Sequence, residues 1–438
     1  MQLVPAAVRL SHAPVWRGSA VALRIARGVP VPLGVLHEVS VRCASRLCCR
    51  LKTMLPSAPV NQAAPVNQAA PVNQAAPVNQ AAPRRGRIGG IDLARALAIV
   101  GMLAVHVGPT RLSDVSGRIY ALPHGRASIL FVLVAGVGVS LLAASRTRTV
   151  ATARWRLAWR SALLLPLGLL LQDLDHRVLV ILPTYAALFL LAIVVLRLRD
   201  HVLVVLACAL TILGPIVYLV GSTAYPEAFA RRAAAWSDPV ADIALGVFAG
   251  PYPLPVWAAP FLFGIWLGRR DLRSAAVRVA LVLGGGAAAV LVPAGASLLA
   301  EVVGEAASPP AWHALLLATP HSQMPPWLVG SIGSAFLVLG GSLVIADALP
   351  RLLAPLVAMG QLALTFYVAH LVILHAWAET LRSGDVANAF RTVLTLTAAA
   401  ALAAWLWRRA FRRGPLEALL DVPWLLTAGR RKGPGRGP

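Results

Sequence analysis

Long apolar runs, separated by short polar segments, follow one another from Arg84 almost to the C-terminus. A helix needs roughly 20 apolar residues to cross the hydrocarbon core of a bilayer. By this measure we predict about ten membrane-spanning helices, at approximately 91–107, 127–143, 158–172, 178–196, 201–221, 253–268, 275–299, 327–346, 357–377 and 388–407. The pattern therefore predicts an all-α fold, a polytopic integral membrane bundle of helices.

The loops between the predicted spans alternate in charge. Arginines collect before the first span and after every second span, at 84–87, 146–160, 197–199, 269–278, 351 and 408–413. Cytoplasmic loops carry the excess of Lys and Arg in membrane proteins, so we expect both termini on the cytoplasmic side. The expected location is the cell membrane, where the multi-pass bundle has membrane lipids as its neighbours.

Composition agrees with this interpretation. Of 438 residues, 58% are hydrophobic and 13% are charged, whereas soluble proteins carry about 25% charged residues. The net charge of +23 suggests nucleic acid at first, but the basic residues form short clusters between apolar runs rather than one basic face. We therefore expect no nucleic-acid partner. Three of the four cysteines lie before residue 50 without suitably spaced histidines, so we expect no metal site.

The N-terminal part differs from the rest. Residues 1–57 form a basic extension, which is either a targeting segment or an over-extended start with Met54 as the initiator. Residues 58–83 repeat Ala-Pro-Val-Asn-Gln with a proline in every repeat, which predicts a disordered linker. We assign residues 84–413 to the transmembrane domain and 414–438 to a basic cytoplasmic tail.

The first predicted span carries three ionisable residues, Asp92, Arg95 and His106. Such a residue costs roughly 2.5–3.5 kcal/mol near the bilayer centre, so it marks a functional site by default. At about 100° per residue, Arg95 and His106 lie within about 20° of one helix face, and Asp92 lies within about 60° of Arg95. Along the axis, Arg95 and His106 are separated by about 16 Å. The sequence therefore predicts one polar stripe with its basic end on the cytoplasmic side.

The stretch from Arg87 to His106 resembles the opening span of bacterial relatives of the heparan-alpha-glucosaminide N-acetyltransferase catalytic domain. That family is related more distantly to the acyltransferase-3-type membrane acyltransferases, in which an arginine and a histidine with the separation of Arg95 and His106 mark the first span. Ala96 stands where that family usually has glycine. The segments 123–138 and 360–370 resemble the entry to the second span and the penultimate span of the same family.

The resemblance implies acyl transfer from a cytoplasmic acetyl-CoA, or another acyl-CoA, to an extracytoplasmic sugar or glycan. Arginine holds phosphates with a forked set of donors, and neutral histidine acts as a base near pH 7. Arg95 and Asp92 would then form the donor site, and His106 or His124 would be the catalytic base. Arg126, Gln361 and His370 are candidate substrate-binding residues.

Simpler interpretations stay open for these residues. Arg95 can be an interfacial anchor paired with Asp92, His106 and His124 can be ordinary interfacial histidines, and the polar residues of the ninth span can serve helix packing. For the whole chain, the alternatives to an enzyme are a transporter or flippase and a non-catalytic membrane scaffold. A homo-oligomer is also left open.

Overall fold

The computed structural model describes residues 87–109, 115–144, 149–174, 178–227, 239–304, 312–382, 384–421 and 423. The predicted N-terminal extension and the repeat lie outside these residues, as does most of the predicted tail. The described part of the chain is helical and contains no strand, which confirms the all-α fold class. Its long helices are α2 (Gly89–Val107), α4 (Arg126–Ala143), α5 (Val150–Gln172), α6 (Leu182–Val195), α7 (Asp200–Ala224), α10 (Leu254–Leu267), α11 (Ala275–Val303), α12 (Pro325–Ala348), α14 (Ala363–Leu381) and α15 (Val386–Ala410).

Five shorter elements connect or extend these helices. They are α3 (Val115–Tyr120), α9 (Pro239–Phe248), the 3₁₀ turn η1 (Trp312–Leu316), α13 (Ala354–Gln361) and α16 (Pro415–Leu419). Among the described residues, the seven helices α2, α4, α7, α11, α12, α14 and α15 are long and apolar enough to cross a membrane. This is the architecture of a multi-pass membrane protein. The count of ten spans and the N-in, C-in orientation stay predictions.

Helix α10 shows why a shorter apolar run also belongs to the bundle. It has 14 residues, or about 21 Å of helix, which is less than the roughly 30 Å of a bilayer core. Its large side chains Trp257 and Phe261 are fully buried. At Gly136 of α4, an added Cβ would lie 2.2 Å from the Phe261 carbonyl oxygen, so the two backbones pack in direct contact. Helix α10 is therefore a core helix, apolar on all sides because it is covered on all sides.

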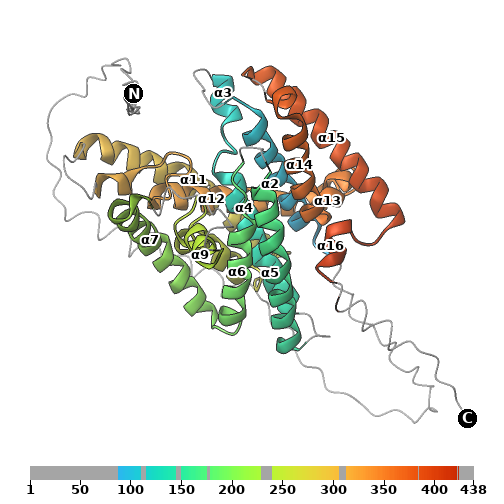
Figure 1. Ribbon diagram of the computed structural model, residues 1–438, viewed down its shortest axis with the longest axis horizontal. Coiled ribbons are helices and arrows are strands. Elements are labelled where there is room, and N and C mark those ends of the chain that lie inside the picture. The colour runs from blue at the N-terminus through green and yellow to red at the C-terminus, as the bar shows by residue number, and fades with distance from the viewer. Residues whose placement is uncertain are drawn as a thin grey trace, which may run out of the picture. The chain divides into compact units, whose positions relative to one another are not determined.

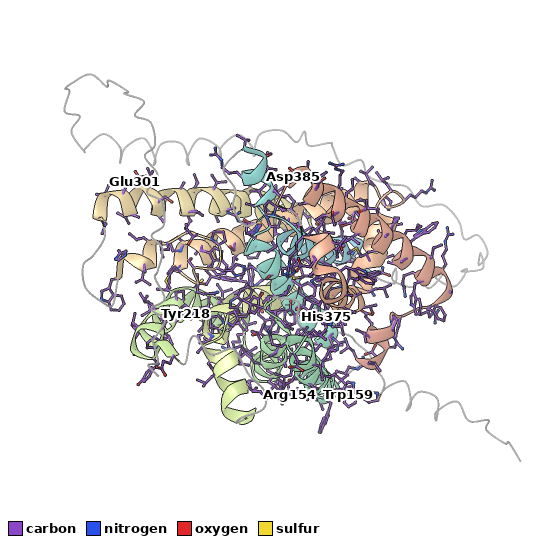
Figure 2. The ribbon with its side chains drawn as sticks, turned by 45° about the horizontal axis from the view of Figure 1, so that its top comes forward. Arg154, Trp159, Tyr218, Glu301, His375 and Asp385 are labelled. Carbon is purple, nitrogen blue, oxygen red and sulfur yellow. The ribbon has the colours of Figure 1, made fainter. Side chains whose placement is uncertain are left out.

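Helix α2 lies at the centre of the arrangement and contacts α4, α12, α13, α14 and α15. Figure 1 shows α13, α14 and α15 on one side of α2, and α7, α11 and α12 on the other. Figure 2 shows Arg154 and Trp159 of α5 at one edge of the bundle and Asp385, which precedes α15, at the opposite edge. The polar residues of the first predicted span are thus placed where several helices meet.

The ninth predicted span is not one helix, which corrects the prediction of a continuous helix at 357–377. The chain breaks at Leu362 (φ −109°, ψ 35°) into α13 and α14. Gly360 of α13 packs directly on the backbone of α2, because an added Cβ would clash with the Asp92 carbonyl oxygen. The break leaves the first N–H groups of α14 without partners in their own helix. The carboxylate of Glu417, on α16, accepts hydrogen bonds from two of them, those of Leu364 (2.8 Å) and Thr365 (3.1 Å).

Candidate functional site

A cavity of about 950 Å³ opens among α2, α4, α5, α6, the loop after α10, the α13–α14 break and α16. Six arginines line it, namely Arg87, Arg95, Arg160, Arg269, Arg270 and Arg273. The acidic side chains in its lining are those of Asp92, Asp271 and Glu417. The formal charge of this lining is therefore positive, which favours an anionic ligand.

Asp92 organises the part of the cavity that α2 contributes. The residue is 1% exposed, and its carboxylate forms ion pairs with both Arg87 and Arg95. A buried carboxylate is stable only when it is paired and hydrogen-bonded, and these two arginines provide both. The hydrogen bond to Asp92 raises the pKa of Arg87 above its ordinary value. Asp92 thereby fixes two guanidinium groups at the cavity wall.

The Arg95 side chain extends from α2 toward α4. An added Cβ at Gly138 of α4 would lie 3.3 Å from the Arg95 Nη2 atom. A glycine at this point therefore leaves room for the guanidinium group. Arg95 keeps 22% of its side chain exposed, and its Nη1 atom donates to Asp92 at 2.5 Å. Arg95 lines the cavity, where a guanidinium group can donate to a ligand such as a phosphate.

The opposite end of the cavity is apolar and aromatic. Phe131, Tyr185 and Phe189 line it, and the cavity follows α4 from Phe131 to Ala144, just past its end. At 1.5 Å per residue, this distance is about 20 Å along the helix. Of the other arginines, Arg87 precedes α2, and Arg269, Arg270 and Arg273 lie in the loop after α10, whereas Arg160 lies in the middle of α5. The cavity thus has a cationic mouth and an apolar far end.

A series of aromatic contacts continues from this apolar end. Phe131 contacts Tyr185 (ring centroids 5.4 Å apart) and stacks on Tyr367 (6.0 Å). Tyr367 meets the His370 ring edge to face at 5.2 Å, and His370 stacks on His106 at 5.5 Å with their planes within 1°. The structure therefore brings together His106 and His370, two predicted site residues from different helices. Neither of them lines the cavity itself.

His124 and Arg126 lie in a third place, at the start of α4. The His124 Nδ1 atom is 3.2 Å from the Ala121 carbonyl oxygen, and Arg126 donates to the Leu122 carbonyl oxygen. Burial lowers the pKa of His124, so its ring is neutral near pH 7. His321, whose φ of 61° is unusual for a residue with a side chain, lies nearby. Its pKa is lowered by burial and, to a smaller extent, by the positive charge that His124 carries when it is protonated.

The seven predicted site residues thus fall into three groups. Asp92, Arg95 and Gln361 line the cavity, His106 and His370 stack beyond its apolar end, and His124 and Arg126 lie apart from both. Sequence reasoning missed Glu417 and Tyr185 in the cavity lining. The only sequence signal for Glu417 was that it is one of two acidic residues, with Asp421, in a tail whose other charged residues are basic. Among the described residues, no three His, Cys, Asp or Glu side chains gather as a metal site requires.

Residues 269–422 match the family described as "Protein of unknown function (DUF418)". The matched segment begins at Arg269 in the cavity mouth and runs through α11 to α16, so it includes Gln361, His370 and Glu417. Helices α2, α4, α5 and α6, which form the rest of the cavity, precede it. Among curated proteins, none matches the chain. The match is to a family of stated unknown function, so it assigns no activity to the cavity.

Proposed function

We propose that this chain is a membrane-bound acyltransferase that moves an acetyl or similar acyl group from cytoplasmic acyl-CoA to an extracytoplasmic sugar or glycan. The observation that carries the proposal is the cavity of about 950 Å³ with its arginine-lined mouth and apolar far end. Acyl-CoA has the same two-part character, with phosphates at one end and a neutral acyl-bearing arm at the other. The resemblance of the first span to membrane acetyltransferases supports the same function.

In this proposal the residues divide into two roles. Arg95, held by Asp92, binds the donor together with the other arginines of the mouth, and Gln361 lines the same space. His106 would take the proton of the acceptor, since a neutral imidazole is a competent base near pH 7, and His370, which stacks on it, would help to bind the acceptor. His124 is the second candidate for the base, and Arg126 beside it would orient the acceptor. No metal is required by this chemistry.

The test uses the full-length protein in lipid nanodiscs. Binding of radiolabelled acetyl-CoA and transfer of the label to a pool of glycans are measured separately. Arg95→Gln should weaken acetyl-CoA binding by about tenfold to a hundredfold, because charge-assisted hydrogen bonds are lost. Arg278→Gln is the matched control, since Arg278 pairs with Asp347 outside the cavity. This variant should bind acetyl-CoA as the wild type does.

The histidine variants test the second step. His106→Gln should lower the transfer rate by about a hundredfold to ten-thousandfold, the typical contribution of a general base, while acetyl-CoA still binds. His124→Gln is measured beside it, and the variant that loses transfer identifies the base. If the wild-type protein neither binds acetyl-CoA nor transfers the label, the proposal is wrong.

One observation favours a transporter as the second candidate. The α13–α14 break is a discontinuous helix whose half-helix begins beside the cavity, and such breaks form substrate sites in many secondary transporters. A transporter would accumulate an anionic solute in sealed vesicles without transferring any acyl group. Solute uptake that survives His106→Gln, together with absent acyl transfer, would favour this candidate over the enzyme.

A further inference from the structure

Tyr185 presents a buried hydroxyl at the apolar end of the cavity. The residue is 4% exposed and lines the cavity from the first turn of α6. Its ring is fixed between Phe131 and Phe189, whose centroids lie 5.4 and 6.1 Å away. Within the described residues, its hydroxyl oxygen has no hydrogen-bond partner. A buried polar group left unpaired is costly and therefore calls for an explanation.

The other buried tyrosines of the described structure show the usual arrangement. Tyr120 donates to the Ala104 carbonyl oxygen at 2.8 Å, and the Tyr367 hydroxyl accepts from the Ile181 N–H at 3.3 Å. The Tyr252 hydroxyl donates to the Leu179 carbonyl oxygen at 3.1 Å. Tyr185 differs from these three in that it lines the cavity and its hydroxyl has no partner among the described residues. A ligand in the cavity would supply the missing partner.

The surroundings of Tyr185 define the chemistry of that partner. Its neighbours in the lining are the apolar side chains of Phe131, Leu182 and Phe189, and Arg95 is the cation whose charge reaches its hydroxyl. The apolar side chains accommodate a neutral group, while Arg95 marks where the charged part of a ligand begins. A phenol is a hydrogen-bond donor that suits a neutral carbonyl oxygen. The arginines at the mouth, in contrast, suit phosphates. The occupant that satisfies both ends has its phosphates at the mouth and a neutral, carbonyl-bearing arm directed toward Tyr185.

We propose that Tyr185 donates a hydrogen bond to a carbonyl oxygen of the neutral arm of the acyl-CoA donor, and that this contact directs the arm toward the aromatic end of the cavity. The inference rests on the proposed function and adds a binding residue to it. The ring of Tyr185 contacts Phe131, which itself stacks on Tyr367 beside His370. An arm held at Tyr185 is thereby aimed at the stacked histidines.

The experiment compares two ligands on the full-length protein in nanodiscs. Acetyl-CoA carries the arm, whereas adenosine 3′,5′-bisphosphate carries phosphates and adenosine without an arm. Tyr185→Phe keeps the ring and removes only the hydroxyl. It should weaken acetyl-CoA binding by about threefold to tenfold, as expected for one neutral hydrogen bond, and leave bisphosphate binding unchanged. Tyr218→Phe is the control and should change neither affinity, because Tyr218, on α7 (Figure 2), is not among the residues that line the cavity.

Each outcome has a distinct meaning. Equal weakening of both ligands by Tyr185→Phe would show that the residue only maintains the cavity, and unchanged affinities would show that its hydroxyl does not touch the arm; either result overturns the inference alone. If the wild-type protein binds neither ligand, the proposed function fails and the inference fails with it. Retained bisphosphate affinity in Tyr185→Phe also shows that the variant is folded.

Discussion

Replacing Asp92 by asparagine tests whether the pair of arginines at the cavity depends on one buried carboxylate. Asp92 is 1% exposed, and its side chain pairs with Arg95, which is 22% exposed, and with Arg87, which is 59% exposed. Asparagine keeps the size and shape of the side chain and removes only the charge. Arg95 then remains in the bundle without a counter-ion, whereas the more exposed Arg87 can turn toward water.

The magnitude follows from these exposures. Removing one partner of a buried ion pair costs about 3–5 kcal/mol, and an arginine at the centre of a membrane helix costs about 2.5–3.5 kcal/mol. The two values agree on about 3 kcal/mol for Asp92→Asn. The interaction with Arg87 is largely exposed and screened by solvent, so Arg87→Gln should cost less than about 1 kcal/mol. Arg87→Gln is therefore the matched control.

The assay is thermal unfolding of the purified protein in detergent, followed by tryptophan fluorescence. The unfolding entropy grows with chain length, and a domain of about 330 residues loses roughly 1–2 °C per kcal/mol. Asp92→Asn should therefore lower the midpoint by about 3–6 °C, and Arg87→Gln by less than about 2 °C. The double variant Asp92→Asn with Arg95→Gln should recover much of the loss, because no uncompensated charge remains. A midpoint for Asp92→Asn equal to that of the control, or a double variant less stable than Asp92→Asn, would refute the reasoning.

Three further predictions concern other parts of the site. Because burial lowers the pKa of His124 from its ordinary 6.5, the unfolded chain binds a proton at this residue more readily than the folded chain does. The contribution of His124 to the stability of the folded protein should therefore be complete above pH 6.5 and decrease below it. Melting curves should show a smaller loss of stability at low pH for His124→Gln than for the wild type. Gly138→Val fills the space used by Arg95 and should weaken acetyl-CoA binding severalfold, whereas Gly284→Val, at a glycine with nothing nearby, should bind as the wild type does. Glu417→Ala removes the cap of α14 and should speed hydrogen exchange in its first turn; unchanged exchange would show that the cap is dispensable.

The positions of the helices were predictable because a chain in lipid must satisfy its backbone hydrogen bonds within each segment. Apolar runs therefore become helices, and each predicted run contains at least one. The spacing of Asp92 and Arg95 also predicted their shared helix face, and their ion pair is the contact that such spacing allows. These features depend on residues close together in the sequence, where helix geometry alone decides which side chains meet.

The α13–α14 break was not predictable from its own sequence, which has no proline at the break. It depends on Glu417, which lies about 50 residues later and binds the N–H groups that the break exposes. The segment around it is held to α5 by the ion pair of Asp421 with Arg156 and by a hydrogen bond from Trp159 to the Leu419 carbonyl oxygen. Contacts between distant segments decide both the break and one wall of the cavity, and no local pattern encodes them.

The separation of the arginines from the histidines imposes a condition on any single reaction at this site. Arg95 and His106 are about 16 Å apart along α2, and only Arg95 lines the cavity. A compact ligand held at Arg95 therefore does not reach the stacked His106 and His370. An extended ligand would approach them, because the cavity follows α4 for about 20 Å and ends at Phe131. The ring of Tyr367 lies between Phe131 and His370 and contacts both. If the chain is an acyltransferase, as proposed, its donor must therefore be long, with a charged end and a thin neutral arm, because a short anionic ligand would leave the histidine pair without a role.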